Sequence, residues 1–180
     1  MDFKEVVEKR RSVRKYSDQP IAKETLEEIV RLSSCSPSWK NTQCVSYIIV
    51  ENPELKEQIA KECVCGFEFN TKTISRAKAL AVLTIKKGLS GCEKDGSFST
   101  TKGDSWEMFD AGVAAQTFCL AAKAEGVGTV ILGIIDEAKT AEILGLAEDE
   151  AVAAFIAMGY PEKEGKMPPR KAVAELLSIR

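Results

Sequence analysis

A basic segment near the amino terminus is the first part of the chain that could bind a ligand. Lys9-Arg-Arg-Ser-Val-Arg-Lys-Tyr16 carries three arginines within five residues, around one serine. Guanidinium groups bind phosphate through paired hydrogen bonds, and a nearby hydroxyl adds a short neutral contact. The segment therefore suits a phosphate or a polyol. Taken alone it is equally typical of a solvated charged face.

A second polar segment, Ser36-Pro-Ser-Trp-Lys-Asn-Thr-Gln43, precedes the first predicted strand. It offers hydroxyl, amide and backbone groups in a turn, with Trp39 as a surface on which a ring could stack. By itself the segment is also what a plain helix-to-strand turn looks like.

The chain contains no histidine and six cysteines. The lack of histidine excludes Ser-His-Asp and Cys-His hydrolases and histidine-ligated metal sites. Cys63 and Cys65 form a C-x-C pair, but no second pair stands at zinc or iron–sulfur spacing. We therefore expect that the chain binds no metal and that its thiols are free. An enzyme of this composition would use carboxylates, lysines, thiols, backbone amides or a bound cofactor.

The composition is that of an ordinary globular protein of one domain, residues 1–180, with 44% hydrophobic and 29% charged residues. The net charge of −2 argues against nucleic acid or an acidic membrane surface as a partner. The apolar runs are shorter than the roughly 18 residues of a membrane helix. The charged start of the chain lacks an apolar signal core, so we expect a cytoplasmic protein.

Hydrophobic periodicity predicts the elements that must position these segments. Helices are expected over residues 2–11, 23–34, 54–64 and 105–125, with a further helix capped by Asp136 and closed by Gly145. Strands are expected over residues 45–51, 79–86, 129–135 and 151–159. This pattern indicates an α+β fold with helices on both sides of a sheet.

Two segments have no obvious place in such a core. Residues 87–104 contain four glycines and many Ser and Thr residues. This segment is long for a loop that only connects two elements, and its length suits a lid or binding segment. Residues 173–179 form an apolar run after a Lys- and Pro-rich stretch. We expect that run to dock on a partner chain, although it could also fold back on its own domain.

The two polar segments, in this order and at this separation, resemble the nitroreductase family. The matching residues are Arg10, Arg11, Ser12, Arg14, Pro20, Ile21, Pro37, Ser38, Asn41 and Gln43. The resemblance continues through Asp110-Ala-Gly, Gln116, residues 124–129, Gly133, the Gly-Tyr-Pro at 159–161 and the basic tail. It covers nearly the whole chain and is weakest over residues 87–104.

The resemblance implies a central, mostly antiparallel sheet flanked by helices, with a C-terminal extension that docks on the partner subunit. It further implies a homodimer that holds FMN at the subunit interface. Arg10, Arg11, Ser12 and Arg14 would bind the phosphate and ribityl chain, and Pro37, Ser38, Trp39 and Asn41 would come from the partner. The remaining implied cofactor contacts are Asn70 at the flavin edge, the backbone of Ile131, Leu132 and Gly133, and Arg170 in the tail, with Lys166 or Lys171 as substitutes.

The implied activity is a ping-pong oxidoreductase in which NADH or NADPH reduces FMN, and a nitroaromatic, quinone or flavin then takes the electrons. No catalytic side chain is required, because the cofactor carries the chemistry. Two alternatives remain open: another flavin reaction on the same fold, such as dehalogenation or desaturation, and a dimer that binds FMN without catalysis. The chain departs from the family at Cys44, where a proline usually follows the glutamine, and in the tail run Met167-Pro-Pro-Arg-Lys-Ala.

Overall fold

The computed structural model describes residues 2–180 and is built around one antiparallel sheet of four strands. The strands are β1 (Val45–Val50), β2 (Ala79–Lys86), β3 (Gly128–Leu132) and β4 (Glu150–Gly159), in the spatial order β1-β2-β4-β3. The four predicted strands are thus confirmed, and every pairing between them is antiparallel.

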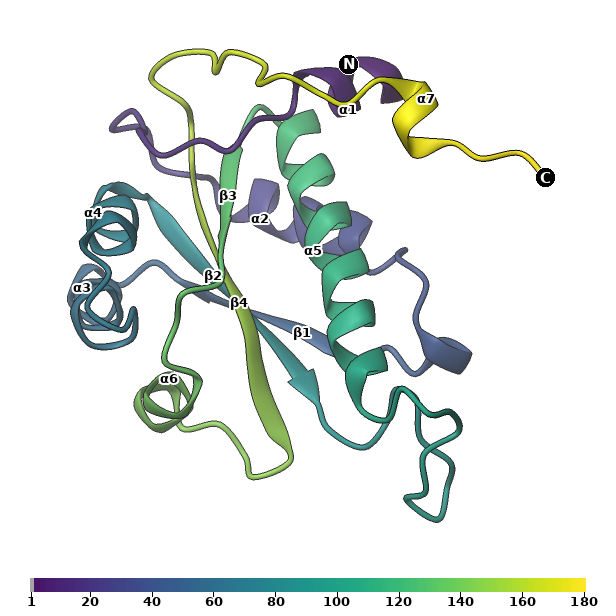
Figure 1. The fold of residues 1–180 in the computed structure, drawn as a ribbon. Helices are drawn as coiled ribbons and strands as arrows, with labels where there is room; N and C mark the ends of the chain where they lie inside the picture. The colour runs from purple at the N-terminus through teal and green to yellow at the C-terminus, as the bar shows by residue number, and fades with distance from the viewer. Residues whose placement is uncertain (1) are drawn as a thin grey trace.

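Two hydrophobic cores lie on the two faces of this sheet, because successive strand residues point to opposite sides. Ala79, Ala81, Leu83 and Ile85 of β2 face the first core, and Leu80 and Val82 face the second. Helices α2 (Lys23–Ser33) and α5 (Ser105–Ala124) cover the first face. Helices α3 (Pro53–Glu62), α4 (Glu68–Arg76) and α6 (Glu137–Leu144) cover the other, as Figure 1 shows.

Helix α5 packs on the sheet through a stripe of small side chains. Its buried residues include Ala111, Ala114, Ala115, Phe118, Ala121 and Ala122. Small side chains allow the helix backbone to approach the strands closely. Met108 and Phe109, near the start of the helix, are exposed, so α5 also presents an apolar surface that its own chain does not cover.

Two differences from the predicted elements have local causes. Helix α4 is not predicted, since EFNTKTISR is rich in residues of low helix propensity; burial of Asn70, Thr73 and Ile74 fixes it. Strand β3 ends at Leu132 rather than at residue 135. The Asp136 N–H donates to the Cys63 carbonyl at 2.8 Å, which draws the chain away from the sheet toward α6.

The basic amino-terminal segment lies along the outer edge of the sheet, after α1 (Phe3–Lys9). Ser12 forms a parallel bridge with Thr129 of β3, and the Val13 N–H donates to the Thr129 carbonyl at 2.9 Å. Residues 162–180 run past α1 at the top of Figure 1, include the short helix α7 (Val173–Leu176), and are exposed throughout.

Candidate functional site

The basic segment is extended at the sheet edge, so its side chains alternate between two sides. Val13 packs against Gly128, where an added Cβ would lie 2.6 Å from the Val13 Cγ2 atom. Ser12 and Arg14 are exposed, and Arg10 is half-buried. Residues 10, 12 and 14 are spaced by two along the segment, so they are predicted to form one row of ligand contacts.

Arg11 stands apart from this row. Its Nη1 atom donates to the carbonyl oxygens of Glu8 and Arg10, at 2.5 and 2.8 Å, and its stem packs on Gly165. The guanidinium therefore satisfies carbonyl groups at the C-terminal end of α1. These contacts fix the segment, and Arg11 also lines the same cavity as Arg10, so its expected contact with the cofactor stays a prediction.

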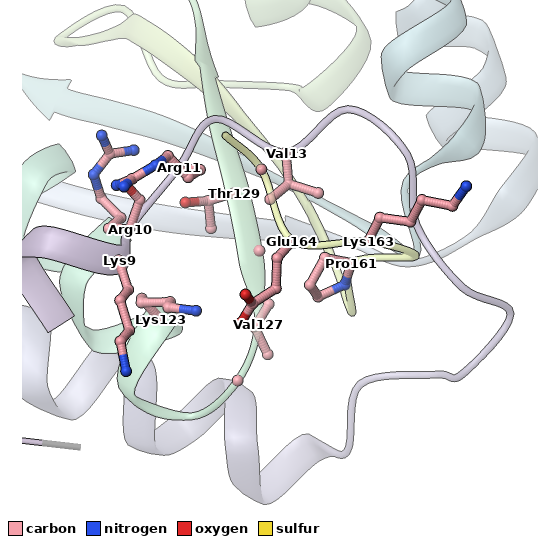
Figure 2. A pocket seen from close by; sticks show the side chains of 13 residues that line it. Lys9, Arg10, Arg11, Val13, Lys123, Val127, Thr129, Pro161, Lys163 and Glu164 are labelled. Atoms are coloured by element: carbon pink, nitrogen blue, oxygen red, sulfur yellow. The ribbon is translucent and has the colours of Figure 1, made fainter. Parts of the chain in front are cut away.

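Two cavities flank the start of the tail beside this segment. One, of about 130 Å³, is lined by Lys9, Arg10, Arg11, Lys123 and Glu164, among others. Figure 2 shows Lys9, Arg10 and Lys123 gathered on one side of it and Glu164 on the other. The second, of about 240 Å³, is lined by residues that include Ser12, Arg14 and Lys15. Because basic side chains outnumber acidic ones in both linings, this end of the molecule suits an anionic group.

An amide and an exposed apolar surface lie beyond Arg14. Asn70 is only 5% exposed, and its Nδ2 atom donates to the Ile134 carbonyl at 3.1 Å. The Arg14 guanidinium lies 5.8 Å from the centre of the Phe69 ring. Ile131 is 45% exposed, whereas the Leu132 side chain is buried, so Leu132 can meet a ligand only through its backbone. A cation, an amide and apolar groups together suit a flat, polar-edged ring.

The second predicted segment forms a tight loop around the short helix η1 (Trp39–Asn41). Lys40, Asn41 and Gln43 have φ angles of 46°, 57° and 51°, which non-glycine residues rarely adopt. The Ser38 Oγ atom accepts from the Gln43 N–H at 2.9 Å, and the Trp39 N–H donates to the Asp110 carboxylate at the same distance. Backbone strain of this kind concentrates at functional sites.

The two predicted ligand segments lie at opposite ends of α5. The η1 loop is held at Asp110, and the basic cavity is lined by Lys123. The helical rise between these two residues is about 20 Å. Figure 1 shows the same separation, with the amino-terminal segment at the top of α5 and the η1 loop near its lower end. One chain therefore does not bring the two segments into one pocket.

The model of the nitroreductase family matches residues 7–160. The chain belongs to the nitroreductase family. A protein of Archaeoglobus fulgidus, provisionally named NADH dehydrogenase/NAD(P)H nitroreductase, is 30% identical over 159 residues, 86% of this chain and 83% of that one. Iodotyrosine deiodinase of Nematostella vectensis is 25% identical over 202 aligned positions, covering 99% of this chain and 75% of the relative.

The fold matches solved structures of nitroreductases. A provisionally named nitroreductase of Exiguobacterium sibiricum, crystallised in complex with FMN, superposes with a TM-score of 0.84 at 20% identity. The superposition covers 100% of this chain and 98% of the other. The predicted fold class is thus confirmed.

In this member of the nitroreductase family, the loop over residues 87–104 is docked on the η1 loop. Lys40 forms an ion pair with Glu93 at 3.0 Å, and the rings of Trp39 and Trp106 lie 4.8 Å apart. The Trp106 Nε1 atom donates to Thr100 at 2.9 Å. The loop is therefore an ordered neighbour of the predicted ligand segment, although its role as a lid stays a prediction.

Cys44, the departure from the family pattern, lies beneath the η1 loop. Its Sγ atom is 3.8 Å from Asp110 Oδ2, and burial is the main cause that raises the pKa of the thiol. Burial raises the pKa values of Cys63 and Cys119 as well. These three thiols are therefore protonated near neutral pH and are poor nucleophiles.

The sequence also predicts that the chain binds no metal and does not cross a membrane. Among residues 2–180, no three His, Cys, Asp or Glu side chains gather where they could hold a metal ion. In the same part of the chain, no helix is long and apolar enough to cross a membrane. The cytoplasmic location stays a prediction. Lys166, Arg170 and Lys171 are exposed in the tail, and their contact with phosphate stays a prediction.

Asp110 belongs to the family pattern in the sequence but lies outside both predicted ligand segments. In the structure it anchors the η1 loop. The available signal was its position on the buried face of α5, one turn before Ala114, where an acidic residue needs hydrogen-bond donors.

Proposed function

We propose that this nitroreductase family member is an FMN-dependent oxidoreductase that works as a homodimer. In this proposal it takes hydride from NADH or NADPH and reduces a small organic acceptor. The observation that carries the proposal is the separation of two ligand-binding segments at opposite ends of α5. Two copies of the chain can bring one segment of each together, so the dimer completes the site.

The residues of the first segment fit the anionic end of FMN. Arg10 and Ser12 would bind the phosphate and ribityl chain, since guanidinium and hydroxyl groups suit phosphate and polyol oxygens. Arg14 would place a positive charge beside the ring, next to Asn70 and the exposed Ile131. The backbone of Leu132 and Gly133 would face the same ring. An added Cβ at Gly133 would meet nothing within 4 Å, so the space beside this backbone is open to a ligand.

The partner subunit would supply the second segment. Pro37, Ser38, Trp39 and Asn41 present a proline, a hydroxyl, an indole and an amide in a loop whose backbone is already fixed. Arg170 of the tail would add a second phosphate contact, with Lys166 or Lys171 as substitutes. Arg11 would act indirectly by fixing the segment that carries Arg10 and Ser12.

Bound FMN would supply the chemistry of hydride transfer from NAD(P)H and of electron transfer to the acceptor. The chain itself would bind and orient the cofactor and compensate its charge. Arg14 would stabilise the negative charge that a flavin gains on reduction. No protein nucleophile is required, which is consistent with buried, protonated thiols and a chain without histidine.

The purified protein should be yellow, or become yellow on reconstitution with FMN. Under anaerobic conditions its flavin absorbance should bleach with NADH or NADPH and return when a nitroaromatic or quinone is added. A protein that stays colourless after incubation with FMN contradicts the proposal. Tight FMN binding without oxidation of either nicotinamide, in the presence of any acceptor, points instead to a non-catalytic dimer.

The similarity to an iodotyrosine deiodinase favours reductive dehalogenation as a second candidate. The proposed flavin site would be unchanged, and only the acceptor would differ. An acceptor panel that includes halogenated tyrosines separates the two: iodide release would support dehalogenation, whereas nitroaromatic or quinone turnover alone would support the first proposal.

A further inference from the structure

A buried carboxylate links the two loops at the lower end of α5. Asp110 is 4% exposed, and its Oδ2 atom accepts hydrogen bonds from three donors. These are the Trp39 N–H at 2.9 Å, the Ser90 Oγ at 2.8 Å and the Cys44 Sγ at 3.8 Å. All three donors are neutral, so the burial of this charge is offset by hydrogen bonds alone.

The backbone that Asp110 holds is strained just beyond the point of attachment. Trp39, which donates to Asp110, is followed directly by Lys40 and Asn41, both at positive φ. Their conformation persists only where surrounding contacts determine it. The bond from Trp39 to Asp110 is one such contact, and the Gln43 to Ser38 bond closes the other end of the loop.

Ser90 fastens a second segment to the same oxygen atom. It lies in the 87–104 loop and is fully buried. The two loops also meet at the Lys40–Glu93 ion pair. Beside it, the Trp39 ring lies 4.8 Å from the ring of Trp106 at the start of α5, tilted at 48° to it. A displacement of Asp110 would therefore disturb both loops together.

We propose that Asp110 is a positioning residue of the flavin site. It holds the η1 loop in the conformation that meets the partner's FMN, and through Ser90 it couples that loop to residues 87–104. The inference rests on the proposed function, because it takes the η1 loop as part of a flavin site. Asp110 acts through Trp39 and Ser90 and does not itself touch the cofactor.

Glu107 provides a matched control that separates a positioning role of Asp110 from a purely structural one. It lies about one turn before Asp110 on α5, is 7% exposed, and accepts a hydrogen bond from the Gly88 N–H at 2.6 Å. It therefore anchors the base of the same 87–104 loop, and its one hydrogen bond is not to the η1 loop. Glu107→Gln and Asp110→Asn each remove one buried negative charge from the same helix with little change of shape.

The experiment compares the wild-type chain with D110N, E107Q and S90A, as FMN-reconstituted protein. For D110N we expect the Kd for FMN to rise about tenfold, which is the scale of one charge-assisted hydrogen bond. The visible circular dichroism of the bound flavin should also change. E107Q should keep both properties, even if its unfolding temperature falls as much as that of D110N.

S90A tests whether Asp110 couples the two loops through Ser90. It also serves as the test of the proposal if D110N does not fold. We expect a KM for the acceptor raised roughly threefold at unchanged kcat with saturating FMN, since the one hydrogen bond from Ser90 to Asp110 is lost. The proposal is overturned if D110N matches E107Q in FMN affinity and flavin dichroism, or, where D110N does not fold, if S90A keeps the wild-type KM. Wild-type protein that binds no FMN would overturn the proposed function instead, so the two failures are distinct.

Discussion

At Arg10, Ser12 and Arg14, a repeat of two residues separates the predicted ligand contacts from packing contacts. Arg11 and Val13 are held against Gly165 and Gly128. Three arginines that look equivalent in the sequence therefore have different surroundings, because the extended backbone turns alternate side chains to opposite sides.

Arg14→Ala should weaken FMN binding by roughly ten- to a hundredfold, the range for a hydrogen bond to a charged group. Its effect on unfolding should be small, because Arg14 is exposed. Arg11→Ala should do the reverse, lowering the free energy of unfolding by about 1 kcal/mol as two carbonyl acceptors lose their donor. Fluorescence titration with FMN and urea unfolding of both variants check this. Equal losses of affinity would contradict it.

Lys56 carries a buried charge away from the flavin site. Its ammonium group donates to the Ala77 carbonyl, and burial lowers its pKa below the ordinary 10.5, with Lys78 adding to the effect. The unfolded chain keeps the ordinary value, so between the lowered pKa and 10.5 the unfolded state binds more protons. The free energy of unfolding attributable to Lys56 must therefore rise with pH across that window.

Lys56→Met should remove this contribution. Urea unfolding of wild-type and variant protein at a series of pH values up to about 10.5 should give a difference that shifts in favour of the wild type as pH rises. Tyr16, Tyr47 and the buried thiols also titrate at high pH, but they are common to both proteins and cancel in the difference. Two parallel curves would show that Lys56 is not perturbed by burial.

Among the elements, the junction between β3 and the basic segment leaves the least room for a larger side chain. Gly128 has no side chain, and Val13 occupies the space where a Cβ would be. The neighbouring Val13–Thr129 hydrogen bond holds the segment at the sheet edge. A side chain at Gly128 must displace the segment that carries Ser12 and Arg14.

Gly128→Ala should lower the free energy of unfolding by about 1–3 kcal/mol, the usual cost of overpacking, and weaken FMN binding as well. Gly112→Ala is the control for unfolding alone, since an added Cβ in α5 at that position meets nothing within 4 Å of its own chain. We expect it to keep or raise the stability of the monomer. Thermal unfolding of both variants and FMN titration of the Gly128 variant test this. Wild-type affinity in the Gly128 variant would show that the segment tolerates a shift.

At the scale of the whole molecule, the chain shows two surfaces that its own fold leaves uncovered. One is the side of α5 that bears Met108 and Phe109, and the other is the tail with Val173, Leu176, Leu177 and Ile179. Together with the separated ligand segments, they support a dimer in which each copy covers and completes the other.

Removal of residues 166–180 should leave the sheet and its helices folded, because every residue removed is exposed. The truncated chain should lose dimerisation and FMN binding together. Sedimentation, far-ultraviolet circular dichroism and FMN titration test this. A truncated chain that still dimerises and binds FMN would show that the tail is dispensable, and replacement of Leu176 and Leu177 by serine would refine the result.

The four strands and most helices could be predicted from the amino-acid sequence alone, and so could the residue types of the proposed flavin site. Strand and helix periodicity depends on local spacing, and the paired motifs keep their order along the chain. Tertiary structure decided what depends on contacts between distant residues. It orders the strands β1-β2-β4-β3, assigns Arg11 to carbonyl groups, fixes α4 by burial, and brings Asp110 under Trp39. It also places the two motifs at opposite ends of α5, because a long helix keeps them about 20 Å apart.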